Sequence, residues 1–168
     1  MQPSEALSTA AQVAVALAGF AGIVVAFRTG AVHEWEELDK FRLRLLLGNS
    51  VLPLTFSLFG MLLLSVEPSP VWRWRACSAL ATVLTIPFAA RMNKAVRNLP
   101  QYRDRGPTRA VYYLFGTMGT TALVLQMVNV VFLNAFWAFF VTIFVHIIAA
   151  AFQFVRMIIF SSDRSNAA

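Results

Sequence analysis

The chain has 168 residues, of which 58% are apolar and only 13% are charged, and its formal net charge is +6. A soluble domain of this length usually carries about 25% charged residues and about 45–50% apolar ones. The composition therefore excludes disordered, collagen-like and ordinary soluble globular classes. It predicts a membrane protein, provided that the apolar residues come in runs long enough to span a bilayer.

Five runs meet that requirement, because a helix needs about 20 mostly apolar residues to cross about 30 Å of hydrocarbon. They cover residues 9–27, 41–66, 72–90, 110–131 and 136–155. The last two belong to one uncharged stretch that is too long for a single crossing, and we expect it to turn at Leu133-Asn134-Ala135. The sequence thus predicts one all-α domain over residues 1–168, a bundle of five transmembrane helices followed by a short tail at 156–168.

The positive charges predict an orientation. Lys and Arg gather after the first run, between the third and fourth runs and in the tail, whereas the opposite side holds only Arg73 and Arg75. Cytoplasmic loops collect Lys and Arg, so we expect the N-terminus outside and the C-terminus in the cytoplasm. The net charge then reflects topology in a bacterial-type inner (plasma) membrane. It predicts contact with anionic lipid head groups and no nucleic-acid partner.

Small residues recur at every fourth position of the first run. They are Ala10, Ala14, Ala18, Gly22 and Ala26. Such a stripe lets a second helix approach closely. The neighbour is either another helix of the same chain or, in a homo-oligomer, a helix of a second copy.

Uncharged polar side chains share faces of the other runs and predict a weakly polar bundle interior. The candidates are Asn49, Ser57, Gln126, Asn129, His146 and Gln153. They serve either as interhelical hydrogen-bonding groups or as a pathway for a small solute or ion. His146 is a candidate proton carrier, but the long apolar runs around it hold no Asp or Glu. That favours a neutral imidazole bonded to an Asn or Gln across the bundle.

Two clusters of opposite charge fall on the predicted cytoplasmic side. The acidic cluster contains Glu34, Glu37 and Asp39, and the basic cluster contains Arg91, Lys94 and Arg97. We expect them to pair with each other or with a partner protein. The i, i+4 pair of His33 and Glu37 is too small a ligand set for a metal site, so no metal and no cofactor are expected.

The sequence contains no phosphate-binding loop, nucleophile elbow, zinc motif or paired catalytic carboxylates, and an enzyme is not expected. Two functions remain open. The first is an oligomeric passive channel or transport component for a small ion or polar solute. The second is a non-catalytic accessory or assembly subunit of a larger membrane complex.

Overall fold

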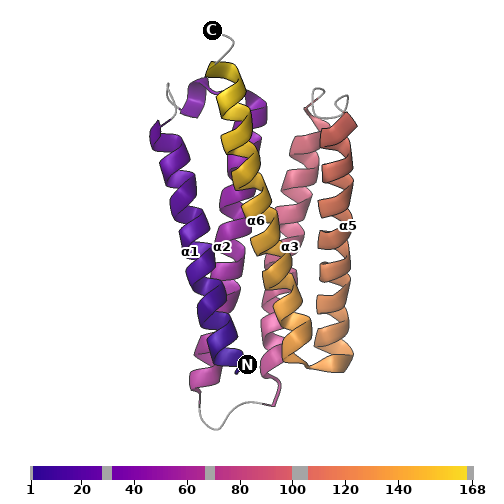
Figure 1. Ribbon diagram of the computed structural model, residues 1–168. Coiled ribbons are helices and arrows are strands. Elements are labelled where there is room, and N and C mark those ends of the chain that lie inside the picture. Colours follow the sequence, from indigo (N-terminus) through magenta and orange to yellow (C-terminus); the bar gives the residue numbers. More distant parts are fainter. Residues whose placement is uncertain (1, 28–31, 67–70, 100–105, 166–168) are drawn as a thin grey trace.

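The computed structural model describes residues 2–27, 32–66, 71–99 and 106–165, and these segments form a bundle of long α-helices without a strand (Figure 1). The α-helices are α1 (Pro3–Phe27), α2 (Glu37–Ser65), α3 (Arg73–Arg97), α5 (Gly106–Val128) and α6 (Phe136–Ser165). A short 3-10 helix, η1 (Val32–Glu34), precedes α2, and a π-helical turn, η2 (Asn129–Leu133), ends α5. The expected all-α class is confirmed.

Four helical segments are long and apolar enough to cross a membrane. They are Pro3–Ala26, Glu37–Ser65, Ala110–Leu133 and Phe136–Ile158. The third expected span is also helical, but α3 carries Arg at both ends. Its uncharged stretch, from Ala76 to Ala90, covers only about 22 Å at the rise of an α-helix.

The helices extend beyond the expected spans. α1 begins at Pro3 instead of Thr9, α2 begins at Glu37, and α3 continues to Arg97. The expected limits marked the edge of the apolar stretch, whereas a helix continues into the polar region until its backbone is capped or broken. The long uncharged stretch is broken at Asn134 and Ala135, within the predicted turn.

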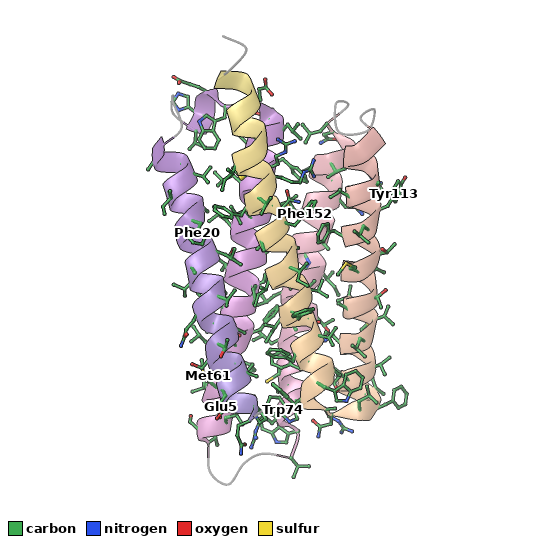
Figure 2. The ribbon with its side chains drawn as sticks, in the orientation of Figure 1. Glu5, Phe20, Met61, Trp74, Tyr113 and Phe152 are labelled. Carbon is green, nitrogen blue, oxygen red and sulfur yellow. The ribbon has the colours of Figure 1, made fainter. Side chains whose placement is uncertain are left out.

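Successive helices run in opposite directions, so the N-terminus and the C-terminus lie at opposite ends of the bundle (Figure 1). We call the end with the start of α2 and the end of α3 the basic end, because it holds Lys40, Arg42, Arg44, Arg91, Lys94 and Arg97. The other is the N-terminal end, where Glu5 and Trp74 lie, while Tyr113 lies toward the basic end (Figure 2). α2 packs against α1, α3 and α6, and α5 packs against α3 and α6.

Three apolar clusters hold the helices together. The first, near the N-terminal end, contains Leu7, Ala10, Phe56, Cys77, Ala81, Phe139 and Ile143. The second joins α1, α2 and α6 nearer the basic end and contains Leu17, Ala21, Trp35, Leu43, Leu46, Ala150 and Met157. The third places Leu38 and Phe41 against Met92, Ala95, Val96, Leu99 and Tyr112. Trp35, Leu38 and Phe41 are therefore buried within the bundle.

The stripe of small residues on α1 is divided between two environments. Ala10 and Ala14 are buried, Ala18 is half-buried, and Gly22 and Ala26 are exposed. A spacing of four residues advances by about 40° around an α-helix at each step, so a long stripe turns away from any one neighbour. The first half of the stripe lies inside the bundle, and the second half faces outward.

Candidate functional site

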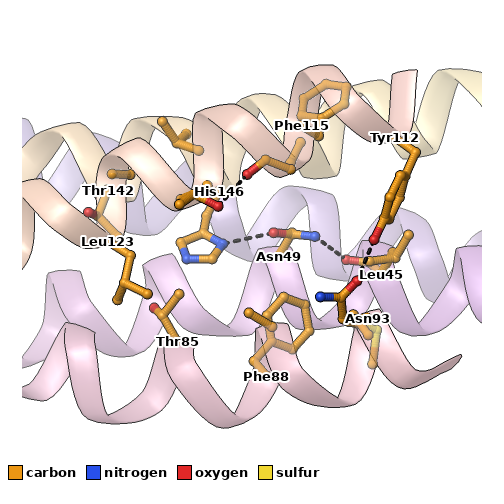
Figure 3. Close-up of a pocket in the computed structure, with 18 of the residues that line it drawn as sticks. Leu45, Asn49, Thr85, Phe88, Asn93, Tyr112, Phe115, Leu123, Thr142 and His146 are labelled. Atoms are coloured by element: carbon orange, nitrogen blue, oxygen red, sulfur yellow. Dashed lines mark hydrogen bonds between the residues drawn. The ribbon is translucent and has the colours of Figure 1, made fainter. Parts of the chain in front are cut away.

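A cavity of about 240 Å³ lies between α2, α3, α5 and α6. Asn49 comes from α2, Thr85 from α3, Gln126 from α5 and His146 from α6. Figure 3 shows the hydrogen-bonded Asn49 and His146 in the middle of the site, with Thr85 and Thr142 toward one end and Asn93 and Tyr112 toward the other.

The structure brings four of the six polar candidates to this cavity. Asn49, Gln126, His146 and Gln153 line it, and each is buried. Ser57 is also buried but is not a lining residue, and Asn129 lies in the turn between α5 and α6. The pattern of polar residues on common helix faces therefore identified four lining residues of the cavity. It did not distinguish them from Ser57 and Asn129, which are buried elsewhere.

The link between Asn49 and His146 fixes the tautomer of the neutral imidazole. Asn49 donates through Nδ2 to the carbonyl oxygen of Leu45 at 2.8 Å, which leaves Asn49 Oδ1 facing His146 Nδ1 at 2.8 Å. An amide oxygen only accepts hydrogen bonds, so Nδ1 must carry the proton. Nε2 of the neutral ring is then unprotonated and can only accept a hydrogen bond. Figure 3 shows that Nε2 points away from Asn49, toward the side of Thr85 and Leu123.

Four side chains of the cavity wall each hold a buried oxygen that has no hydrogen-bond partner in the described part of the chain. They are Thr85 Oγ1, Gln126 Oε1, Thr142 Oγ1 and Gln153 Oε1. A buried polar atom left without a partner costs about 1–3 kcal/mol, and native structures tolerate few of them. Their concentration at one cavity is therefore the main chemical feature of the bundle interior. We call these four residues the cavity cluster.

Three other hydroxyl groups on the same helices are satisfied locally, whereas Ser57 Oγ, outside the cavity, also lacks a partner in the described residues. Ser50, Thr55 and Thr82 donate to the carbonyl oxygen four residues earlier, at 2.8–2.9 Å. This bond is available to most Ser and Thr residues within a helix. Thr85 and Thr142 lack such a bond, so their hydroxyl groups remain able to donate to, or accept from, a molecule in the cavity.

Apolar residues bound the cavity along the bundle axis. Phe41 of the third apolar cluster lines it on the side of the basic end. Toward the N-terminal end, the first apolar cluster fills the space between α1, α2, α3 and α6. Phe56 and Ile143 of that cluster are fully buried. The cavity is therefore bounded by apolar side chains toward the N-terminal end, whereas the exposed lining residues Asn93, Gly116 and Thr120 show that it is open to the surface of the bundle.

The lining also contains polar residues beyond the six candidates, namely Thr85, Asn93, Tyr112 and Thr142. The Tyr112 hydroxyl donates to Asn93 Oδ1 and ties α5 to α3 near the basic end. Thr142 could have been found from the sequence, because it lies four residues before His146 and therefore on the same face of the helix. The polar residues of the sequence offered no comparable pattern for Tyr112.

Asn129 belongs to a second polar cluster, which we call the turn cluster: Asn129, Ser78, Ala135 and Asn134. Asn129 Nδ2 donates to Ser78 Oγ at 2.7 Å and to the Ala135 carbonyl at 3.1 Å, while Asn129 Oδ1 accepts from Ala135 N at 2.8 Å. Asn134 adopts a left-handed conformation (φ 48°) and donates to the carbonyl oxygen of Val71. These bonds close the α5–α6 turn onto the start of α3.

The expected charge clusters lie at the basic end. Asp39 forms a buried ion pair with Arg42 at 3.3 Å, and Lys40 pairs with Glu37 at 2.8 Å. Both pairs are internal to α2, so pairing between the acidic cluster and Arg91, Lys94 and Arg97 stays a prediction; Glu34 contacts His33 at 3.7 Å. Within residues 2–27, 32–66, 71–99 and 106–165, no three His, Cys, Asp or Glu side chains are grouped to hold a metal ion.

Comparisons of this chain with protein-family models, curated proteins and solved structures find no match. The inferences about function therefore depend on the geometry of the cavity and on the arrangement of the helices.

Proposed function

We propose that this chain is a transport component of a membrane, and that it takes a small polar solute into the cavity between α2, α3, α5 and α6. The observation that carries the proposal is the cavity cluster, whose buried oxygens lack partners in the described residues. A bundle held only by interhelical hydrogen bonds would be more stable with these groups paired or replaced by apolar ones. A solute that binds there satisfies them.

The proposal includes five membrane crossings. α2 ends and α3 begins at the N-terminal end, whereas α3 ends and α5 begins at the basic end (Figure 1). A chain in which α2 and α5 both cross the bilayer therefore requires α3 to cross it as well. Arg73 and Arg97 lie near opposite ends of α3, and long basic side chains reach the polar interface from such positions.

The charge distribution supports the orientation within the membrane. Among the described basic residues, Arg73 and Arg75 lie at the N-terminal end, and the other Lys and Arg residues lie toward the basic end. The positive-inside rule then favours a cytoplasmic C-terminus and an external N-terminus in an inner (plasma) membrane. Arg91, Lys94 and Arg97 are exposed and suited to contact anionic head groups there.

The first apolar cluster, on the N-terminal side of the cavity, favours a gated passage over a permanently open pore. A solute that crosses must displace side chains of the first apolar cluster, such as Phe56 and Phe139, or pass between them. We therefore propose a passive transport component whose conformation changes during transport.

Solute flux into liposomes tests this proposal. Purified protein is reconstituted, and uptake of glycerol, urea and small cations is followed by light scattering or by ion-sensitive dyes. We expect flux above that of protein-free liposomes, and lower flux for Gln126→Leu. The matched control is Gln12→Leu, which removes an exposed glutamine on the outer surface of α1. Absence of flux for every solute under any gradient contradicts the proposal.

The second half of the α1 stripe supports a homo-oligomer. Gly22 is exposed, and a Cβ atom there would meet no heavy atom within 4 Å. A close helix–helix contact in a membrane uses small residues of this kind. We expect Gly22→Leu to reduce oligomerisation in native membranes while the monomer keeps its stability. Ala14→Leu, at a fully buried position, should instead destabilise the monomer by about 1–3 kcal/mol. An unchanged oligomer in Gly22→Leu would show that this face contacts lipid.

The accessory-subunit alternative has its own support in the exposed charges of the basic end. Glu34 lies at the end of η1 and Glu37 at the beginning of α2, while Arg91, Lys94 and Arg97 lie at the end of α3. Purification in a mild detergent separates the two functions. A stoichiometric partner that is lost when Arg91, Lys94 and Arg97 are changed to Gln favours the accessory role.

A further inference from the structure

The atoms around the cavity differ in what they can offer to a solute. His146 Nε2 is an acceptor, because the bond to Asn49 places the proton on Nδ1. Gln126 donates through Nε2 to the carbonyl oxygen of Ala138 at 2.7 Å, which fixes the amide and leaves Oε1 as its unpartnered atom. The two positions whose chemistry is fixed by hydrogen bonds are therefore both acceptors.

The remaining polar groups are less specific. Thr85 and Thr142 carry hydroxyl groups that either donate or accept, and the amide groups of Gln153 and Asn93 carry N–H donors as well as an oxygen. The Tyr112 hydroxyl already donates to Asn93 Oδ1. At His146 Nε2 and Gln126 Oε1 the cavity wall thus complements a molecule that brings N–H or O–H donors.

Charge limits the solute further. Among the described lining residues none is Asp, Glu, Lys or Arg. An ion that left water for the buried part of the cavity, beside His146 and Gln126, would lose hydration without meeting an opposite charge from a lining residue, and this transfer is strongly unfavourable. A volume of about 240 Å³ also lies below the range of about 300–1,000 Å³ that is usual for drug-sized ligands.

We infer that the cavity binds a small uncharged solute with several hydrogen-bond donors, such as a polyol or urea, and that His146 Nε2 and Gln126 Oε1 accept from it. This inference rests on the proposed function, since it names the class of solute that the transport component carries. Asn49 is a positioning residue in this scheme, because it holds His146 in the tautomer that leaves Nε2 free.

Nitrogen NMR of the imidazole rings tests the inference directly. The chain has only two histidines, so protein labelled with ¹⁵N-histidine gives two sets of ring signals, and His33→Gln assigns the set of His146. We expect separate protonated Nδ1 and unprotonated Nε2 resonances. Glycerol should shift the Nε2 resonance toward that of a hydrogen-bonded nitrogen, in a saturable manner. Dimethoxyethane has the same number of non-hydrogen atoms as glycerol but no donor, and it should leave the resonance unchanged.

Two variants test whether the glycerol-induced shift of the His146 resonance arises from binding in the cavity. Gln126→Leu should weaken glycerol binding by about fivefold, the effect of one lost hydrogen bond. Gln12→Leu, on the outer surface of α1, should leave binding unchanged. If Gln126→Leu fails to fold, Thr142→Val replaces a hydroxyl with a methyl group of similar shape and should weaken binding to a similar extent.

The possible outcomes distinguish an error in the inferred class of solute from an error in the proposed transport function. An Nε2 that is protonated in the solute-free protein, an equal shift with dimethoxyethane, or no shift with glycerol each overturns the inference. Glycerol binding at His146 without glycerol flux in liposomes keeps the inference and contradicts the transport function. Flux of small cations in the absence of glycerol binding supports transport and overturns the uncharged, donor-rich solute.

Discussion

Two buried amides three positions apart on the same stretch of chain behave differently. Asn129 uses both ends of its side chain, with bonds to Ser78 and to the backbone of Ala135. Gln126, one helical turn earlier, donates to Ala138 but leaves Oε1 without a partner in the described residues. Both residues are almost completely buried. Burial and residue type therefore do not distinguish the turn cluster from the cavity cluster, whereas their hydrogen bonds do.

This difference in hydrogen bonding indicates a structural role for the turn cluster and a binding role for the cavity cluster. In the turn cluster the side-chain amides of Asn129 and Asn134 form hydrogen bonds to Ser78 Oγ and to the backbone of Val71 and Ala135, so the cluster rigidifies the α5–α6 connection and its contact with α3. In the cavity cluster the same kinds of groups reduce stability unless a further molecule completes their bonds. A variant that removes a polar group should therefore destabilise the protein at the turn and have a small or opposite effect at the cavity.

The largest effect is expected for Asn129→Ala. This change removes three hydrogen bonds and leaves buried partners unsatisfied, with a loss of about 2–3 kcal/mol in the free energy of unfolding. Gln126→Leu removes one bond together with an unpartnered oxygen, and its loss should stay below about 1 kcal/mol. Unfolding by SDS in mixed micelles measures both values. Equal losses for the two variants would remove the distinction between the clusters.

A smaller effect is expected where a glycine supports the cavity wall. A Cβ atom at Gly48 would overlap the ring of Phe88, which lines the cavity and lies edge-on to His146 with ring centroids 6.2 Å apart. Gly48→Ala should therefore displace Phe88, reduce stability by about 1–2 kcal/mol and weaken glycerol binding.

Gly60→Ala is the matched control for Gly48→Ala. A Cβ atom at Gly60 would lie 2.9 Å from Leu7 Cδ1 and 3.4 Å from Phe139 Cε1, both in the first apolar cluster. The variant should lose a similar amount of stability but keep the glycerol-induced shift of the His146 resonance. Loss of that shift in Gly60→Ala would mean that the apolar layer and the cavity are coupled.

The sequence was sufficient to predict the elements of the fold, because transmembrane helices are specified by long apolar runs. It also predicted the partner of His146, since the absence of Asp and Glu from the surrounding runs left an Asn or Gln as the best hydrogen-bonding residue. Asn49 is that partner. The helix limits were less predictable. The length of an apolar stretch matches the thickness of the hydrocarbon, whereas the helix itself can continue beyond the hydrocarbon, as α6 does to Ser165.

The division of the polar residues into two clusters could not be predicted in this way. Gln126 and Asn129 share a face of one run and have similar chemistry. Their different roles depend on a π-helical turn and on a left-handed Asn134, which bring the start of α6 back to Asn129. Likewise, only the packing of α2 and α6 shows where the small stripe on α1 leaves the bundle, between Ala14 and Gly22.

The smallest change in stability is expected for Thr142→Val, and its sign tests the role of the cavity most directly. Thr142→Val replaces a buried hydroxyl that has no partner in the described residues with a methyl group of nearly the same volume. Removal of an unsatisfied polar atom should stabilise the protein by about 1 kcal/mol, and the same change should weaken glycerol binding. In the control Thr55→Val, the lost hydroxyl donates to the carbonyl oxygen of Val51 at 2.9 Å. That variant should change neither quantity by more than about 0.5 kcal/mol. A residue retained only for packing would not gain stability while it loses binding, so this combination of signs would identify Thr142 as part of a solute site. A loss of stability in Thr142→Val would instead mean that its hydroxyl is already satisfied in the membrane, as those of the turn cluster are.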